Sequence, residues 1–480
     1  MKLDAYWQLE GTLTTDSPMH IGNGKAEPHR FDPEEELELA DVQLIACTVN
    51  QEPIIPGAPL KCKPIIPGSA LKGVLKRRIE FDSADASAIF GKKESESKGF
   101  GGLVQFLDAI ATSEVAFEEN ILRRTEIDAI RGSAKEHLLF AHWMVPVGTT
   151  FKVRIRGKSY EAGEWKKHAA LLNMTLSGSL RFGAWSGNDR GKCSWKLGAV
   201  RVLDAIAIAA WLKNPCPVES AFSPDRLKDR SSELESIKAS GLEGEKRRIE
   251  ITLSFKDHHF LVNNPNKVVK GQDGDGGLSH AARRVADDKL ILPAESFRGV
   301  LAHQAARIAR TCGKSGDRQE VRLNADGSIP ASVDCMTRLF GGPGWKSVLE
   351  LDDFIQVGDT PNSATQEFVA IDRFTAAGGM DNRKFNAEGG WQPQLKGAVT
   401  IDFGRLRKLG DPSASLGLLA LVLRDLAEGD LNFGWGSGKG YGWANVVTNP
   451  PSVQWVESNL NGLFDGSVKD WIKAWEKGGL

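Results

Sequence analysis

The stretch LNFGWGSGKGYGWANV, residues 431–446, has an earlier counterpart in LRFGAWSGNDRGKCSW, residues 180–195. It is not a phosphate-binding Walker loop, because Lys439 is followed by Gly440 rather than by serine or threonine. A dinucleotide GxGxxG motif fails as well, since lysine and tyrosine stand where glycine is required and a strand-like segment follows. The bare backbone instead indicates a loop that lies against a ligand or a helix, with Lys439 available for a phosphate. The alternative is a glycine-rich turn that serves packing alone.

Three further motifs recur in the same order in both halves of the chain. The spacing between partners changes along the sequence, which indicates two related domains with different loop insertions rather than a short repeat. The paired motifs are PIIPGSALKG (64–73) with LILPAESFRG (290–299), AIFGKK (88–93) with RLFGGP (338–343), and EIDAIRGS (126–133) with AIDRFTAAGG (370–379).

Each half begins with an alternating strand, YWQLEGTL (6–13) or IEITLSF (249–255). A turn, an amphipathic helix and further strand and helix patterns follow, in an order typical of the ferredoxin-like (RRM-like) sandwich. We therefore predict an α+β fold with two such domains in tandem. The predicted boundaries are a first domain at 1–212, a polar linker at 213–247, a second domain at 248–450 and a helical tail at 451–480.

The 480 residues carry a formal net charge of −1, which gives no global attraction to nucleic acid. No apolar run approaches the roughly 18 residues of a membrane helix, so a cytoplasmic protein without membrane contact is expected. The six cysteines contain no CxxC pair. We expect reduced cysteines, with neither a zinc site nor a disulfide framework.

Two helix starts are candidate phosphate sites. In PGSALKG and PAESFRG, Ser69 and Ser296 are expected to cap the helix amides, and Lys72 and Arg298 stand in the first turn, where the helix dipole attracts an anion. The glycine after each basic residue is costly inside a helix unless a ligand or a packed strand approaches closely. The alternative is an amphipathic helix with solvated basic residues.

The catalytic candidates are acidic, because no GxSxG, HExxH or paired cysteine and histidine motif occurs. Asp41, in ELADVQLI, could orient a metal-bound water or deprotonate a ribose 2′-hydroxyl. The alternative is a solvated loop carboxylate. His20 could assist as acid or base, or be structural.

Together these motifs resemble the CRISPR-associated RAMP superfamily, specifically a tandem-fused backbone subunit of a type III (III-D-like) effector complex. The resemblance rests on GTLTTDSPMHIGNGK, IIPGSALKG, LPAESFRG, LFGG, VAIDRFTAAG followed by Lys384 and Phe385, and the glycine-rich loop. It implies that each palm domain carries a β-hairpin thumb and holds guide CRISPR RNA. Other RAMP-type and large subunits and the target RNA would be the remaining partners.

The resemblance also implies divalent-metal-dependent cleavage of guide-paired target RNA by an aspartate, with Mg²⁺ or Mn²⁺ as cofactor. Asp41 fits this role and would be the metal ligand. In the second copy the candidates are Asp273, Asp275, Asp287 and Asp288, and Ser279 and His280 stand near the expected site, so that copy could be inactive. The expected RNA contacts are His20, Lys25, Ser69, Lys72, Arg77, Arg131, Arg190, Lys192, Ser296, Arg298, Arg373 and Lys439.

Two alternatives of other classes stay open. One is a scaffold that binds RNA and has no chemistry of its own. The other is a stand-alone guide-processing endoribonuclease, for which His20 or His280 would be the catalytic residue.

Overall fold

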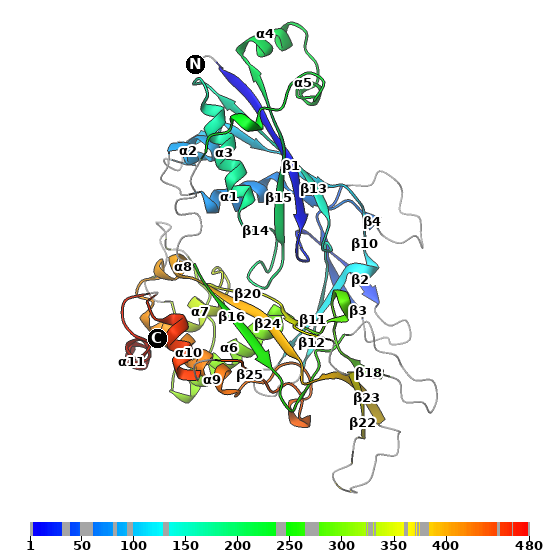
Figure 1. Cartoon of the computed structure of the whole chain (residues 1–480), viewed down its shortest axis with the longest axis vertical. Coiled ribbons are helices and arrows are strands. Elements are labelled where there is room, and N and C mark those ends of the chain that lie inside the picture. Colours follow the sequence, from blue (N-terminus) through cyan, green and yellow to red (C-terminus); the bar gives the residue numbers. More distant parts are fainter. Residues whose placement is uncertain are drawn as a thin grey trace. The chain divides into compact units, whose positions relative to one another are not determined.

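The computed structural model divides the chain into two compact units (Figure 1). Unit 1 comprises Met1–Ser186 and Arg190–Glu243, and unit 2 comprises Gly187–Asp189 and Gly244–Leu480. The structure describes residues 3–30, 39–48, 61–79, 84–93, 99–127, 134–236, 246–264, 278–322, 324, 330, 333–359, 363–369, 371, 374, 384–448, 452–462 and 464–478.

Unit 1 is built on a mostly antiparallel sheet in the order β14-β15-β1-β13-β9-β5, with β8 also paired to β13. Trp7, Leu9 and Leu13 alternate along the first strand and are fully buried, because successive strand residues point to opposite faces. The strands are β1 (Ala5–Thr15), β5 (Ile65–Ile66), β8 (Val104–Phe106), β9 (Ala109–Ala111), β13 (Thr150–Ser159), β14 (Leu180–Arg181) and β15 (Lys192–Asp204).

Helices cover one face of this sheet in Figure 1 and close the core of unit 1. They are α1 (Gly68–Arg78), α2 (Ala84–Phe90) and α3 (Glu164–Ser177). Two short ribbons complete the palm, β4 (Lys61–Cys62) with β10 (Val115–Ala116), and β6 (Gly91–Lys93) with β7 (Gly99–Gly101).

Unit 2 repeats this plan with the sheet order β19-β21-β24-β16-β25, and β20 also pairs with β24. Its strands are β16 (Lys246–Ser254), β19 (Ile291–Leu292), β20 (Leu349–Leu351), β21 (Phe354–Gln356), β24 (Gln394–Asp402) and β25 (Asn445–Val446). Its helices are α6 (Ala294–Thr311), α7 (Cys335–Phe340), α8 (Phe403–Arg407) and α9 (Ser413–Glu428).

The strand order identifies the fold of both units. In unit 1 the first strand β1 lies between the last, β15, and the third, β13, and β9 lies outside β13; in unit 2, β16 lies between β25 and β24, with β21 outside. A helix follows the first and the third strand in each unit. This is the strand, helix, strand, strand, helix, strand order of the ferredoxin-like sandwich, so the predicted α+β fold is confirmed.

A β-hairpin extends from each palm at the predicted thumb position. In unit 1, β11 (Ile121–Ile127) and β12 (Ala134–Trp143) join β3 (Leu39–Ile45) and β2 (Gly22–Arg30) in a four-stranded sheet. In unit 2, β22 (Ser363–Val369) and β23 (Lys384–Trp391) form the hairpin, with β17 (His259–Phe260) and β18 (Leu278–Ala281) paired to β23. The second hairpin strand pairs in parallel with β3 in one unit and with β18 in the other.

The helix starts are capped differently from the prediction. The capping positions are Pro67 and Pro293, and neither helix has a side-chain cap from its own start. Instead, the Asp108 carboxylate accepts a bond of 2.7 Å from the Gly68 amide, and the Asp353 carboxylate accepts one of 2.8 Å from the Ala294 amide. The predicted capping role of Ser69 and Ser296 is therefore wrong, because carboxylates distant in sequence occupy the positive helix ends.

The segments predicted as linker and tail are folded where the structure describes them. After α4 (Ala205–Lys213), α5 (Val218–Ala221) and Phe222 pack against Leu203 in unit 1. In the tail, α10 (Ser452–Leu460) and α11 (Val468–Gly478) pack on α9, and their tryptophans join the unit 2 core. The exact domain boundaries stay predictions. Among the described helices, none has both the length and the apolar composition of a membrane span.

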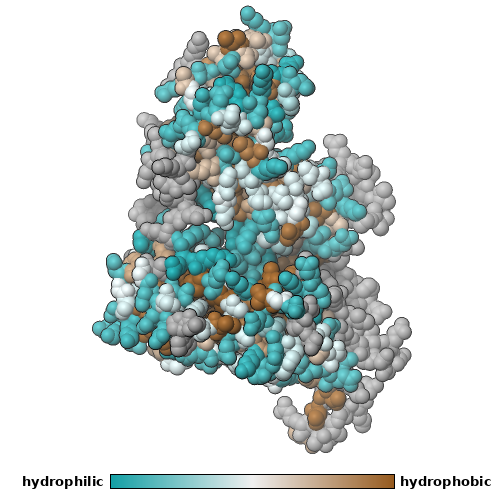
Figure 2. Space-filling view, in the orientation of Figure 1, coloured by the Kyte–Doolittle hydropathy of each residue, from teal (hydrophilic) through white to brown (hydrophobic). Residues whose placement is uncertain are grey.

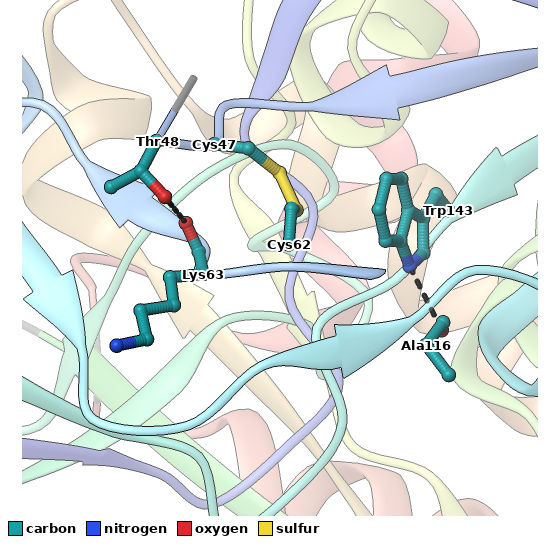
Figure 3. The surroundings of a disulfide bond; sticks show 6 residues. All are labelled: Cys47, Thr48, Cys62, Lys63, Ala116 and Trp143. Carbon is teal, nitrogen blue, oxygen red and sulfur yellow. Dashed lines mark hydrogen bonds between the residues drawn. A yellow bond between two sulfur atoms is a disulfide. The ribbon is translucent and has the colours of Figure 1, made fainter. Parts of the chain in front are cut away.

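One expectation about the cysteines is wrong. Cys47 and Cys62 form a disulfide, with Cα atoms 5.9 Å apart (Figure 3). The backbone already brings them together, because the Thr48 amide donates to the Lys63 carbonyl and Cys47 bridges to Pro64. The two cysteines are 15 positions apart in the sequence, and no motif of the sequence indicates that they pair. The other four cysteines are free.

The carboxylate at the start of α6 yields a stability prediction. Replacing Asp353 with alanine removes the partner of the Ala294 amide, so we expect a loss of about 0.5–2 kcal/mol from unit 2. Calorimetry of the full chain measures this as a lower unfolding midpoint. Ser296→Ala is the matched control and should leave the midpoint unchanged. Equal midpoints for Asp353→Ala and the unaltered chain would contradict the assignment.

Candidate nucleic-acid interface

The glycine-rich loop of unit 2 is fixed to the segment that begins with β17. The Trp435 amide donates to the Leu261 carbonyl at 2.8 Å, and the Gly442 amide donates to the His259 carbonyl at 2.7 Å. Gly434 and Gly442 have φ values of 84° and 80°, and a Cβ on either would overlap a backbone carbonyl oxygen. These two glycines therefore serve close packing within the chain.

The loop of unit 1 makes the same contacts. The Ala184 amide donates to the His20 carbonyl and the Gly191 amide to the Pro18 carbonyl, each at 2.9 Å. Gly183 and Gly191 have positive φ values, and again a Cβ would overlap a carbonyl oxygen. The repeated sequence thus encodes one repeated backbone arrangement.

An aromatic cluster lies beside the unit 2 loop, where the hairpin meets the palm. The Trp435 ring centroid lies 4.7 Å from that of His280 and 5.3 Å from that of Tyr441, and the Lys439 ammonium lies 5.4 Å from the Trp435 centroid. We call the whole group the unit 2 cluster, and its rings are His259, His280, Phe368, Phe385, Trp391, Trp435 and Tyr441.

Hydrogen bonds orient part of the unit 2 cluster. The Tyr441 hydroxyl donates to Gln366 Oε1 at 2.6 Å, and Gln366 Nε2 lies 3.0 Å from His259 Nε2. Because an amide nitrogen only donates, His259 Nε2 accepts and the neutral ring carries its proton on Nδ1. Within the described residues, that buried Nδ1 has no hydrogen-bond partner.

The equivalent group in unit 1 is smaller, and we call it the unit 1 cluster: His20, His142 and Trp185 with Arg124. The Arg124 guanidinium carbon lies 4.2 Å from the Trp185 ring centroid. The His142 centroid lies 4.3 Å from that of Trp185 and 5.2 Å from that of His20. Both units therefore place a cation over a loop tryptophan at the base of the hairpin, an arrangement of the kind that binds bases and phosphates.

The comparison with known families agrees with this doubled arrangement. The model of the RAMP superfamily matches residues 63–192 and again residues 269–445. The chain belongs to the RAMP superfamily. Each match runs to the glycine-rich loop, so the family pattern occurs once in each unit. This membership indicates a CRISPR-associated, RNA-binding function. No curated protein matches the chain.

The end of the unit 2 hairpin of this RAMP protein carries apolar residues. Val369, Ile371 and Phe374 are 49%, 67% and 89% exposed, and Figure 2 shows hydrophobic atoms over the outer part of β22. A surface of this kind suits contact with stacked bases.

His20 is a buried member of the unit 1 cluster. It is 5% exposed, and its Nδ1 donates to the Trp143 carbonyl at 2.8 Å. Burial lowers the pKa of His20. A buried, neutral imidazole with one nitrogen engaged is poorly placed for direct contact with a phosphate, which disfavours the predicted RNA contact of this side chain.

The start of α1 keeps its predicted basic side chains at the surface. Lys72 is half-buried, and Ser69 and Arg77 are exposed. A Cβ on Gly73 would meet nothing within 4 Å, and the same holds for Gly299 in α6. The alternative of a tightly packed strand at these glycines is therefore wrong, and open space for a ligand remains.

Two predicted arginine contacts are instead used by the fold. The Arg298 guanidinium donates to Ser347 Oγ at 2.7 Å and to the Leu349 carbonyl at 2.8 Å. Burial lowers the pKa of Arg298 to about 10, so it stays charged at neutral pH. Arg190 is 2% exposed. Neither guanidinium is presented to solvent in this conformation, because Arg298 turns inward from α6 and Arg190 turns inward from the glycine-rich loop.

The remaining predicted contacts are distributed as follows. Lys25 is exposed on β2, Lys192 is half-buried at the start of β15, Ser296 is half-buried in α6, and Lys439 is exposed. Arg131 and Arg373 lie outside the described residues. The structure thus brings Lys439 to an aromatic cluster and leaves the other described cations on separate elements.

The acidic candidates do not form a shared site. Asp41 is exposed in β3, where Pro28 of β2 is its partner, so the prediction of a loop position is wrong. Asp287 and Asp288 are exposed near Arg284, while Asp273 and Asp275 lie outside the described residues.

A separate acidic group surrounds the end of α9. Carboxylate oxygens of Asp425, Glu428 and Asp430 lie within 4.8 Å of one another. Arg424 pairs with both Asp425 and Glu428, and Gln304 donates to Asp425. We assign no metal to this group, because Arg424 and Gln304 already engage the carboxylates of Asp425 and Glu428.

Sequence reasoning named His20, His280 and Phe385 but missed the two tryptophans on which the clusters are built. Trp185 and Trp435 each stand inside a glycine-rich loop, in AWSG and GWGSG. A large ring between glycines was a usable signal, because such loops otherwise favour small residues. Arg124 and His142 gave no comparable signal, since only strand pairing brings them to Trp185.

The unit 1 cluster predicts a pH dependence of stability. Burial, with the nearby charges of His20 and Arg124, lowers the pKa of His142 to about 4. As the pH falls, His142 is protonated near pH 6.5 in the unfolded chain but only near pH 4 in the folded unit. The contribution of His142 to the free energy of unfolding is therefore fully present above pH 6.5, and it falls by up to roughly 3 kcal/mol toward pH 4.

The comparison of His142→Gln with the unaltered chain isolates this contribution from that of the carboxylates. Calorimetry between pH 7 and 4.5 should show a shallower decline of the unit 1 midpoint in the variant. His303→Gln, at an exposed position of α6, is the control and should keep the original slope. Parallel slopes for all three proteins would refute the explanation.

Proposed function

We propose that this protein is a guide-RNA-binding backbone subunit of a type III, III-D-like, CRISPR effector complex. The observation that carries the proposal is the doubled interface, in which both units fix a glycine-rich loop to the palm and place a cation over a loop tryptophan beside the hairpin. Two similar interfaces in one chain suit successive segments of one strand of RNA. Other RAMP-type and large subunits would complete the assembly.

Phosphate contacts would position the guide and pairing with the target would supply specificity. Lys72 and Lys439 reach the surface on the helix start and on the loop, and such cations hold a backbone without reading its sequence. Aromatic rings at the hairpin base can accept unstacked bases of any identity. Recognition of the target then follows from base pairing.

We further propose that unit 1 cleaves the paired target RNA through Asp41. Its exposed carboxylate lies on β3, directly beside the hairpin strand β12. In unit 2, Ser279 and His280 lie on β18, which pairs with the hairpin strand β23 and shifts register between Leu278 and His280. Neither side chain is a carboxylate, and we propose that this copy does not cleave.

A divalent metal, Mg²⁺ or Mn²⁺, fits one carboxylate only if RNA phosphates and water complete its shell, as Mg²⁺ commonly allows. Within the described residues, Asp41 belongs to no group of three metal-binding side chains. The ion would neutralise charge on the phosphodiester. Asp41 itself would hold the ion in place or accept the proton of the attacking hydroxyl.

Guide binding is tested with the double variant Lys72→Glu and Lys439→Glu. Log affinity falls as log salt concentration rises, and the loss of two contacts to single-stranded RNA should make this negative slope shallower by about 1.4. Filter binding of labelled guide at several salt concentrations measures it. The control of equal charge change is a second double variant, Lys469→Glu and Lys477→Glu, at two exposed positions of α11. An affinity of the Lys72 and Lys439 variant equal to that of this control would count against the interface.

Cleavage is tested with Asp41→Asn in the assembled complex with guide and target. We expect cleavage to slow by roughly a hundred-fold or more at the positions served by unit 1, with unchanged RNA binding. Glu27→Gln, exposed on the adjoining strand, is the control. Full cleavage at every position by Asp41→Asn would remove the catalytic proposal and favour the scaffold without chemistry.

A further inference from the structure

A pocket of about 320 Å³ lies on unit 2 at the outer side of the glycine-rich loop. Its polar and aromatic lining comes from the end of β16, the turn after it, the end of α9 and the last strand: Ser254, Lys256, His258, Gly429, Trp443 and Asn445. Ligand pockets typically measure about 300–1,000 Å³, so this one suits a small ligand.

Internal hydrogen bonds hold two of the ring systems in place. Trp443 Nε1 donates to the Ser437 carbonyl at 3.3 Å, and His258 Nδ1 lies 3.2 Å from the Gly440 carbonyl oxygen. A carbonyl only accepts, so Nδ1 carries the proton, and Nε2 of the neutral ring is an acceptor. Trp443 nevertheless remains 37% exposed. The Trp443 ring is therefore held in place and is still accessible to a ligand.

The wall of the pocket requires glycine at position 429. Gly429 has a φ of 87°, and a Cβ there would overlap Oδ1 of Asn445. Because glycine has no side chain, Asn445 Oδ1 occupies space that the Cβ of any other residue at position 429 would fill. Its amide adds a hydrogen-bonding group to the edge of the pocket.

Lys256 is the cation that lines the pocket. No carboxylate pairs with Lys256 among the residues that the structure describes, and the neighbouring Asp257 accepts a bond from Gln392. The opposing charges are those of the acidic group at the end of α9, beside Gly429, which Arg424 offsets in part. An anion in the pocket would therefore lie at Lys256.

Unit 1 has lost this pocket chemistry. In the aligned loops, Lys192 stands where unit 2 has Trp443. The Ser194 hydroxyl donates to Asp16 at 3.0 Å, and the Lys192 amide donates to Ser17 Oγ at 2.9 Å. In the part of unit 1 that the structure describes, these groups therefore satisfy one another instead of lining a pocket like that of unit 2.

We propose that this pocket binds one nucleotide of a single-stranded RNA. The base stacks on Trp443, its edge meets the Asn445 amide and His258 Nε2, and a phosphate faces Lys256. A fixed indole beside a lone ammonium is the combination that holds single strands without sequence preference. That the ligand is RNA rests on the proposed function. A free nucleoside monophosphate offers the same base and phosphate to the pocket.

The test uses the purified full chain, freed of RNA, with a labelled ten-nucleotide single-stranded RNA and, separately, with AMP. Trp443→Ala should weaken RNA binding by roughly five- to hundred-fold, and Trp443→Phe should restore most of it. Lys256→Gln should make the negative slope of log affinity against log salt concentration shallower by about 0.7. Val447→Ala, 55% exposed just beyond β25, is the control and should change nothing.

The outcomes separate the pocket from the proposed function. If the unaltered chain binds RNA and Trp443→Ala binds it equally well, the pocket proposal is overturned and the function stands. If the chain binds no RNA, the proposed function fails, and the AMP titration then tests whether the pocket binds a nucleotide. AMP binding that Trp443→Ala abolishes would then assign a free nucleotide, and no AMP binding would overturn the pocket too.

Discussion

Two backbone hydrogen bonds in each unit hold the functional surface together. They join the glycine-rich loop to the segment after the first palm strand, from Trp435 and Gly442 in unit 2 and from Ala184 and Gly191 in unit 1. They form only because glycines at positive φ let the two backbones touch. The loop tryptophans, Trp185 and Trp435, stand at or next to the residues that make this contact.

The two copies have kept this frame and changed the side chains on it. Unit 2 surrounds Trp435 with aromatic rings, whereas unit 1 places Arg124 and two histidines around Trp185. Such divergence is tolerated because backbone bonds, rather than particular side chains, position the loop. The backbone frame can therefore stay the same while the side chains around it differ between the two units.

Binding and cleavage make different demands on this chain. In the proposed interface, contacts to the strand are spread over cations and rings on several elements, so the structural roles of Arg298 and Arg190 leave other contacts in place. The proposed cleavage would depend on one carboxylate, that of Asp41 on β3. On this proposal, one unit of a duplicated protein could lose cleavage without losing RNA binding.

The sequence by itself determined the duplication, the α+β class and the places of the hairpins, because strand alternation, helix periodicity and glycine loops are local patterns that survive divergence. It also placed Lys72 and Lys439 at the surface. Tertiary structure alone decided that Asp108 and Asp353 cap the helices, that Cys47 meets Cys62, and that Arg298 and His20 turn inward. Each of these depends on contact between segments distant in sequence, and a local pattern carries no information about such partners.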